Sequence, residues 1–290
     1  MLPTSVITGM PCQYAQRRPF AVMLAGDPVA RPLAGIGAAD MVFEMPVTPG
    51  GITRLMAVFQ CEEPKEIGAI RSARQDFIPL VAALRAIFVH WGGEHDALQA
   101  LNQHIIDNID ALLYDGTVFY RKALIIPPHN GFTTIQNLLD RAKILAYSLE
   151  NTFGGFTHTN QEPSRNLSTI ANTISVDYVV PYDVSWIYDT ATKTYGRNRN
   201  QTPEIDANTQ QQVHAGVVIV MHTDTQPVSD LYNRVRVTGQ GNAVIYQHGV
   251  AIAATWKKGT LLSDPLLFVD ASGNQIPLVP GSVWVEIVTQ

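Results

Sequence analysis

The sequence predicts an α+β protein in two parts: a mixed α/β N-terminal domain over residues 1–155 and a smaller, mostly antiparallel β C-terminal domain over residues 165–290. With 290 residues, 46% of them hydrophobic, the chain exceeds the usual size of one domain and has enough apolar residues for two cores. Helical spacing occurs up to about residue 150 and then gives way to short β-type runs. The polar, turn-rich stretch from Gly154 to Ser168 between them is the best linker candidate.

Three short strands are predicted near the N-terminus, where apolar runs are separated by Gly and Pro. They cover Phe20 to Leu24, Met41 to Phe43 and Arg54 to Phe59. A buried strand from Ala86 to Val89 follows. Because helical segments alternate with these strands, the N-terminal part should be a mixed α+β layer domain.

Three helices are predicted in the same part. Ser72 is a plausible N-cap for the first helix, whose apolar residues recur at three- and four-residue spacing: Phe77, Leu80, Val81 and Leu84. A short second helix covers His95 to Gln103, and a longer one runs from about Thr134 to Leu149. Thr133 or Thr134 would cap the longer helix.

The C-terminal part consists of short β-type runs: Ile174 to Val180, Val184 to Tyr188, Val217 to His222, Arg234 to Val237, Ala243 to Tyr246, Ile252 to Lys257 and Val283 to Val288. Gly239 to Asn242 and Ser272 to Asn274 supply turns at hairpin-like spacing. We expect a compact β domain whose large aromatic residues pack in the core rather than forming a sugar platform. These residues are Tyr182, Tyr188, Tyr195, Trp256 and Trp284.

Charge and motifs exclude several classes of protein. The net charge of −5 comes from 20 basic and 25 acidic residues without long runs of like charge, which argues against a nucleic-acid or anionic-membrane surface. No apolar stretch approaches the roughly 20 residues that span a bilayer. Gly-x-Ser-x-Gly, Walker and His-Glu-x-x-His motifs are absent, and two glycines interrupt the possible metal ligands between His90 and Asp96. We therefore expect no metal and no cofactor.

Two cysteines, Cys12 and Cys61, are too few to define a disulfide framework or a compartment. They could form one disulfide. Free, mostly buried thiols are the expectation from the sequence.

Four segments place polar groups at strand ends or turns of the N-terminal part: Glu44 with Gly50 to Arg54, Ile67 to Arg74, His90 to Gly93, and Pro127 to Asn130. Arginine forks and glycine amides suit carboxylate or phosphate oxygens, while a carboxylate and a histidine can exchange protons at neutral pH. If the segments converge, they form a polar cleft. Its candidate ligand-binding residues are Arg54, Arg71, Ser72, Arg74, His90, Gly92, Gly93 and Asn130, and its candidate catalytic residues are Glu44 and His129.

A purely structural interpretation of the same residues is also open. In it, Arg54, Arg71 and Arg74 pair with acidic side chains of the same part of the chain, and His90 and His129 cap loops. The acidic residues concerned are Asp40, Glu44 and Asp76.

Taken in order, the residues of the chain resemble the YerB-like family of bacterial lipoproteins, which combine two domains of unknown function. The N-terminal resemblance rests on Thr8-Gly9, Arg18 to Met23, Ala30 to Pro32, Ala39 to Glu44, Gly50 to Arg54, Ile67 to Arg74 and Pro128 to Asn130. The C-terminal resemblance rests on Tyr182-Asp183, Tyr188-Asp189, Tyr195 to Arg197, Gly239 to Gly241, Thr255 to Lys258, Asp270 to Gly273 and Pro280 to Trp284. One departure is Glu204, where we expect the family to carry a histidine.

The resemblance implies an extracytoplasmic protein. Family members have an export signal and a lipid-attachment cysteine upstream of the Thr-Gly start, so we expect membrane anchoring through an N-terminal lipid or segment not present in this chain. The family supplies no secure activity.

Three hypotheses for the function follow. In the first, a cell-envelope protein binds an anionic or glycan cell-wall ligand in the polar cleft. In the second, the cleft is a hydrolase or lyase site with Glu44 as general acid and His129 as a base or as a residue that orients the substrate; a Glu44 engaged by two arginines would instead favour a structural or binding role. In the third, the chain is a non-catalytic envelope adaptor that offers an edge strand or exposed Trp256 and Trp284 to a protein partner.

Overall fold

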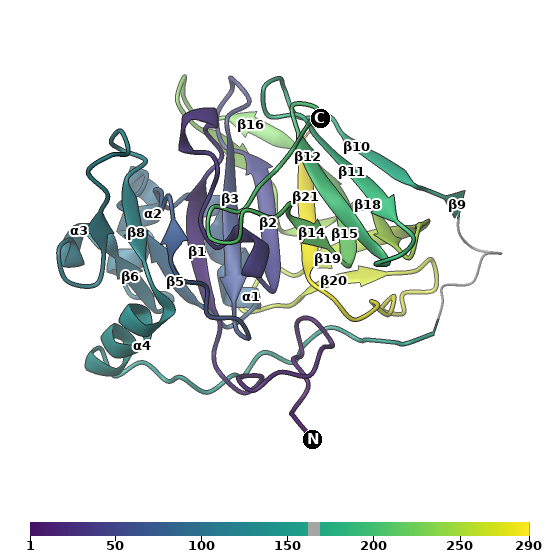
Figure 1. Ribbon diagram of the computed structural model, residues 1–290, viewed down its shortest axis with the longest axis horizontal. Helices are drawn as coiled ribbons and strands as arrows, with labels where there is room; N and C mark the ends of the chain where they lie inside the picture. Colours follow the sequence, from purple (N-terminus) through teal and green to yellow (C-terminus); the bar gives the residue numbers. More distant parts are fainter. Residues whose placement is uncertain (162–168, 290) are drawn as a thin grey trace.

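A mixed sheet of 11 strands forms the centre of the computed structural model, which describes residues 1–161 and 169–289 (Figure 1). Its strand order is β20-β19-β18-β15-β21-β2-β3-β1-β5-β6, with β9 pairing β19 beside this path. In that order the strands are Leu266–Val269, Val250–Lys258, Gly239–Gln247, Val217–Thr223, Val283–Thr289, Met41–Pro46, Thr53–Phe59, Phe20–Ala25, Ile87–His90 and Asn108–Asp110, with β9 at Thr169–Ile170.

The sheet passes without a break between the two parts of the sequence. Strand β2 of the N-terminal part pairs in parallel with β21, with Met41 opposite Val283 and Glu44 opposite Glu286. Helices and both kinds of strand pairing are present, as expected for an α+β protein. The boundary between residues 155 and 165 stays a prediction.

The central strands are buried on both faces, which explains why their sequences are mostly apolar rather than alternating. In β1, Phe20 and Val22 belong to one hydrophobic core and Ala21 and Met23 to another, because successive side chains point to opposite faces of a sheet. The second core includes residues of both sequence parts, for example Met23 and Val285. Separate cores for the two parts are therefore not observed.

Helices and a second sheet cover the faces of the large sheet (Figure 1). The helices are α1 (Ile78–Ala83), α2 (His95–Asn102), α3 (Ala111–Tyr114) and α4 (Ile135–Ile144), with 3₁₀ turns at Pro28–Ala30, Ile36–Ala38 and Gln75–Phe77. The second sheet contains β10 (Thr173–Val176), β11 (Val184–Asp189), β12 (Thr194–Arg199), β13 (Thr202–Pro203) and β14 (His214–Ala215). Smaller sheets contain β4 (Ile67–Gly68), β7 (Tyr120–Arg121) and β8 (Gly131–Thr133), and β16 (Thr225–Pro227) and β17 (Asn233–Val235).

The helix predictions are confirmed in position but not in every cap. Thr134 caps α4, and its side chain accepts a hydrogen bond from the amide of Asn137, as predicted. Ser72 is not an N-cap, because the chain around it is extended and the helical region begins only after Arg74. The backbone of that extended segment is occupied instead by pairing with neighbouring strands, for example between the amide of Arg71 and the carbonyl of Met23.

The predicted turn from Gly239 to Asn242 is also wrong. These residues begin β18 and pair with β19, with Gly241 opposite Trp256. A Cβ at Gly241 would lie 2.5 Å from the indole Nε1 of Trp256, so the glycine permits the tryptophan to cross the strand closely. The glycines therefore mark close packing, not chain reversal.

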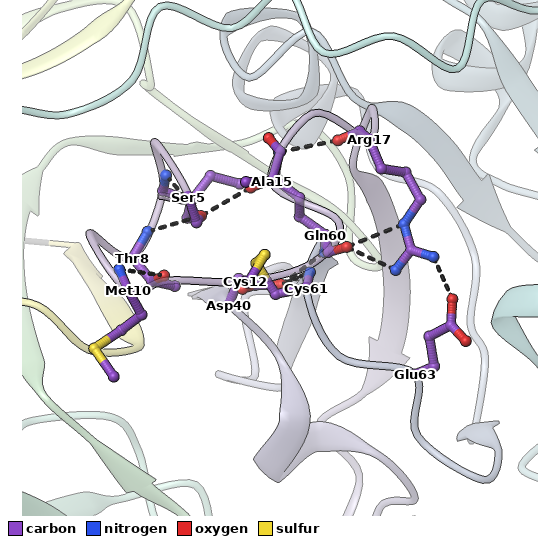
Figure 2. The surroundings of a disulfide bond; sticks show 11 residues. Ser5, Thr8, Met10, Cys12, Ala15, Arg17, Asp40, Gln60, Cys61 and Glu63 are labelled. Atoms are coloured by element: carbon purple, nitrogen blue, oxygen red, sulfur yellow. Dashed lines mark hydrogen bonds and ion pairs between the residues drawn. A yellow bond between two sulfur atoms is a disulfide. The ribbon is translucent and has the colours of Figure 1, made fainter. Parts of the chain in front are cut away.

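Cys12 and Cys61 form a disulfide, so the expectation of free thiols is wrong. Figure 2 shows how the N-terminal segment lies along the chain that follows β3. Gln60 fastens the same contact: its side chain accepts a hydrogen bond from the Ser5 hydroxyl at 2.8 Å and donates one to the carbonyl of Ala15 at 3.1 Å. Sequence spacing could not reveal this pairing, because 49 positions separate the two cysteines.

Trp256 and Trp284 are buried, with 0% and 1% of their surfaces exposed, and therefore belong to the core. Of the two partner surfaces in the adaptor hypothesis, this removes the exposed tryptophans and leaves the edge strand as a prediction. Among the described residues, no helix has the length and apolar character needed to cross a membrane.

Candidate functional site

The candidate site lies where the parallel strands β1 and β5 end. Residues 69–74 cross this edge between the two strands: the amide of Ala25 donates to Ala69, the amide of Arg71 donates to Met23, and the amide of Trp91 donates to Arg71. The carboxyl ends of adjacent parallel strands face the same edge of a sheet, which is a common place for a binding site. Two of the four polar segments predicted from the sequence therefore meet here.

Asp27, which follows β1, brings two arginines together. Its Oδ2 atom lies 2.8 Å from Nη1 of Arg54 and 3.8 Å from Nε of Arg71. Arg54 reaches this position because it is opposite Ala25 in the pairing of β3 with β1. The register of the central sheet thus places Arg54 beside the segment that carries Arg71.

Arg74 and His129 belong to the same group, because Arg71 and Asp27 act electrostatically on both of them. Burial lowers the pKa of Arg74, and Arg71 lowers it further. Burial lowers the pKa of His129; Asp27 opposes this effect, whereas Arg71 and Arg54 add to it. We call Arg54, Arg71, Arg74 and His129 the cationic cluster.

The cationic cluster has more positive charge than its neighbours neutralise. Burial lowers the pKa of Arg54 to about 10, with Asp27 opposing and Arg71 and Arg74 contributing, so the group remains charged at neutral pH. Asp27 contacts Arg54 and Arg71, and Glu94 acts on Arg74. Three guanidinium groups therefore face two nearby carboxylates, an excess that favours an anion.

The cationic cluster also contains side-chain nitrogens without a hydrogen-bond partner. Within the described chain these are the Nε atoms of Arg54, Arg71 and Arg74 and the Nδ1 atom of His129, all of them shielded from solvent. A buried polar group that forms no hydrogen bond costs about 1–3 kcal/mol, and more when charged. Ligand oxygens placed among these nitrogens would remove that cost.

A hairpin loop carries His129 into the cluster. The loop joins β7 to β8, and its base is closed by a hydrogen bond from the amide of Lys122 to the carbonyl of Asn130 at 2.9 Å. A second bond, from the amide of Ile70 to the carbonyl of Gly131 at 2.9 Å, fixes the loop beside Arg71. The third predicted segment, Pro127 to Asn130, therefore joins the site. Asn130 is buried beside His129, where its Oδ1 accepts from Arg121 at 3.3 Å.

Two tyrosines from the C-terminal part flank the site. The guanidinium of Arg74 lies over the ring of Tyr232, 5.1 Å from its centroid, and that of Arg31 lies over Tyr182 at 5.8 Å. Arg31 also donates to the carbonyl of Gly26 at 2.6 Å, next to Asp27. Both sequence parts therefore contribute to the surroundings of the cationic cluster.

Glu44 does not belong to the cluster. Its carboxylate is completely buried and accepts hydrogen bonds from Arg199 at 2.6 and 2.8 Å, from Arg197 at 2.5 Å and from the hydroxyl of Thr53 at 2.5 Å. Arg197 and Arg199 also bond Glu204, and Arg197 bonds Glu286. We call Glu44, Arg197, Arg199, Glu204 and Glu286 the buried ion network.

The buried ion network holds Glu44 as an anion. Burial alone would raise the pKa of Glu44, but Arg199 and Arg197 outweigh it and hold the pKa well below its usual range. The pKa of Glu286 is raised, chiefly by burial, with repulsion from Glu44 adding to it. A neutral Glu286 would leave two carboxylates facing two guanidiniums. An ionised carboxylate engaged by two arginines is suited to a structural role and poorly suited to general-acid catalysis.

His90 is likewise part of the fold rather than of the cluster. Its ring lies fully buried between the carbonyl of Gly92, at 2.8 Å, and Oδ1 of Asn108, at 3.2 Å. Gly92 and Gly93 pair with Ala73, which positions the segment holding Arg74, and Ser72 lies half-buried in that segment. Of the predicted residues, the structure thus gathers Arg54, Arg71, Arg74, His129 and Asn130 at one place.

The structural interpretation of the arginines differs from the observed pairing. Asp40 accepts hydrogen bonds from the amides of Gln60 and Cys61, and Asp76 accepts one from the amide of Val235. The partner of Arg54 is Asp27, which sequence reasoning missed. Its position directly after a strand, next to Gly26, was an available signal; the long-range partners Arg197, Arg199 and Glu286 had none.

The comparisons place the chain in a family of unknown function. The family "Protein of unknown function (DUF3048)" matches by its N-terminal domain over residues 7–148 and by its C-terminal domain over residues 174–285, so the chain belongs to it. A relative named "Putative lipoprotein YerB", from Bacillus subtilis (strain 168), is 29% identical over 97% of this chain and 85% of its own length. The crystal structure of YerB protein from Bacillus subtilis is similar with a TM-score of 0.89 and 28% identity, covering 99% of this chain and 97% of that one. The resemblance to the YerB-like family is thereby confirmed.

Proposed function

We propose that this protein is a cell-envelope protein that binds an anionic group, a phosphate or a carboxylate, in the cationic cluster. Four nitrogens without a hydrogen-bond partner, one each in Arg54, Arg71, Arg74 and His129, carry this proposal, because they are shielded from water and lie around a positive excess. Arginine forks would hold the oxygens of the anion in pairs. A sugar acid or sugar phosphate of the cell wall has this chemistry.

The envelope location is supported by the relative's name, which describes a lipoprotein. We extend that location to this chain and place it outside the cytoplasm. A disulfide between Cys12 and Cys61 agrees with an oxidising compartment.

Calorimetric titration with inorganic phosphate and with a soluble uronic acid tests the binding proposal. The Arg71→Ala, Arg74→Ala double variant should lose at least about tenfold in affinity, since a charged hydrogen bond contributes about 1.5–3 kcal/mol. Arg236→Ala is the matched control, because it removes a partly exposed arginine whose partner, Asp224, contacts no residue of the cationic cluster in an ion pair. Equal affinity in the double variant and the control would refute the proposal.

A further inference from the structure

The hairpin loop that carries His129 ends in an unusual apolar tip, residues 123–128. The sequence of this tip is Ala-Leu-Ile-Ile-Pro-Pro, and every residue except Ile125 is exposed. Leu124 is exposed over 100% of its surface and Ile126 over 69%. Consecutive exposed apolar residues are unfavourable in water and usually indicate a binding surface.

The apolar tip and the cationic cluster are parts of one loop. The amide of His129 donates to the carbonyl of Ile126 at 3.0 Å, so one turn joins the exposed tip to the buried ring. Leu124 and His129 are five positions apart, a span of at most about 18 Å even for an extended chain. An anionic group at His129 would thus lie close to an apolar surface.

We infer that the anion bound at the cationic cluster is the phosphate of a lipid headgroup in a membrane surface, and that the apolar tip inserts among the acyl chains beside it. This inference rests on the proposed function and names its ligand class. The headgroup layer on each side of a bilayer is about 5–8 Å thick. A tip that extends past a held phosphate therefore reaches the hydrocarbon.

Two properties of the chain favour a specific contact over general attraction to an anionic surface. The net charge is −5, so the protein as a whole is not drawn to negative lipid. The basic residues at the base of the loop are already engaged, because Arg121 pairs with Asp115 and Lys122 with Glu66. Binding should then depend on the apolar tip and the cationic cluster together.

Vesicle co-sedimentation tests the inference, with phosphatidylglycerol in phosphatidylcholine against phosphatidylcholine alone. The full chain should bind the phosphatidylglycerol vesicles more tightly, because the choline cation compensates the charge of the phosphate in phosphatidylcholine. The Leu124→Ser, Ile126→Ser variant should bind them at least about tenfold more weakly, because a buried Leu or Ile side chain contributes about 1.5–3 kcal/mol of transfer free energy, a tenfold change being 1.4 kcal/mol. A matched control, Ile170→Ser with Leu261→Ser, changes two exposed residues of the same type outside the loop and should bind like the wild type.

Titration with inorganic phosphate separates this inference from the proposed function. The tip variant should keep the phosphate affinity of the wild type, which also shows that it is folded. Phosphate binding without vesicle binding, or vesicle binding unaffected by the tip variant, would overturn the lipid inference and leave the anion site standing. If the wild type binds neither phosphate nor vesicles, both proposals are overturned. A tip variant that abolishes self-association in sedimentation velocity, with no effect on vesicles, would assign the tip to a second copy of the chain and overturn the lipid inference.

Discussion

Two groups of arginines in this molecule differ in how far nearby carboxylates neutralise them. Arg197 and Arg199 are buried, and the carboxylates of Glu44 and Glu204 each hydrogen-bond both of them, so the two positive charges are neutralised within the protein. Arg54 and Arg71 share one carboxylate, and each has an Nε atom without a hydrogen-bond partner. Matched buried charges fix a structure, whereas unmatched ones leave room for a ligand.

Glu44→Gln should destabilise the protein by about 3–5 kcal/mol, because removing one partner of a buried ion pair leaves an uncompensated charge. Urea unfolding measures the loss. Glu63→Gln is the control: Glu63 is partly exposed in its pair with Arg17, and such surface pairs contribute about 0–1 kcal/mol. Similar losses in both variants would contradict the assigned structural role of Glu44.

Sulfate binding should become tighter as the pH falls from 8 to 5. The pKa of His129 is lowered from 6.5, mainly by burial. The ring is therefore neutral at pH 7 and gains a proton only at lower pH. Protonation adds a positive charge beside Arg54 and Arg71, while sulfate keeps its own charge throughout. Isothermal titration of His129→Gln, which cannot be protonated, should give a flat profile over the same range; an equally steep one would remove His129 from the site.

Among the secondary-structure elements, the sequence pattern predicted those strands and caps that depend on residues close together in the chain. The continuous apolar sequences of β1 and β3 and the cap at Thr134 are visible in the sequence, because burial on both faces and hydrogen bonds across three residues leave local signals. The prediction of a turn at Gly239 was wrong, because Gly241 leaves room for the side chain of Trp256 on the next strand. The expectation of free thiols was wrong, because only the tertiary fold brings Cys12 and Cys61 together.

The site shows the same division. Arg54, Arg71, Arg74, His129 and Asn130 could be proposed from their positions beside strand ends and glycines. The sequence could not show that Glu44 and His90 lie apart from these residues. Their positions depend on Arg197 and Arg199 from the second sheet and on Asn108 from β6. Distant residues decide which polar side chain is neutralised.

Replacing both Cys12 and Cys61 by Ala should lower the free energy of unfolding by roughly 2–4 kcal/mol, because the cross-link restricts the unfolded chain over a sequence separation of 49. Urea unfolding of the variant, and of the wild type with and without dithiothreitol, measures the effect. The reduced wild type should match the variant. A midpoint unaffected by either change would show that the contacts of Gln60 alone hold the N-terminal segment.

At the scale of the whole molecule, the two parts of the sequence form one structure. The central sheet joins β2 to β21, one core includes Met23 and Val285, and the buried ion network joins Glu44 to Arg197. Neither part can lose these contacts without exposing strand edges and charges. The cationic cluster, flanked by Tyr182 and Tyr232, depends on the same union.

Thermal unfolding should therefore occur in a single cooperative transition. Differential scanning calorimetry would show one peak, with calorimetric and van't Hoff enthalpies that agree. Glu44→Gln should move this peak as a whole to lower temperature. Two resolved peaks, of which only one moves, would indicate independent domains.

The disulfide also determines how the molecule would carry a mechanical load. A pulling force applied at the N-terminus passes from Cys12 to Cys61, directly after β3, which is held between β2 and β1 inside the sheet. The load then acts along β3 and must shear two sets of strand hydrogen bonds at once. With the disulfide reduced, the same force would first peel away the N-terminal segment, one contact at a time, before reaching the sheet (Figure 2).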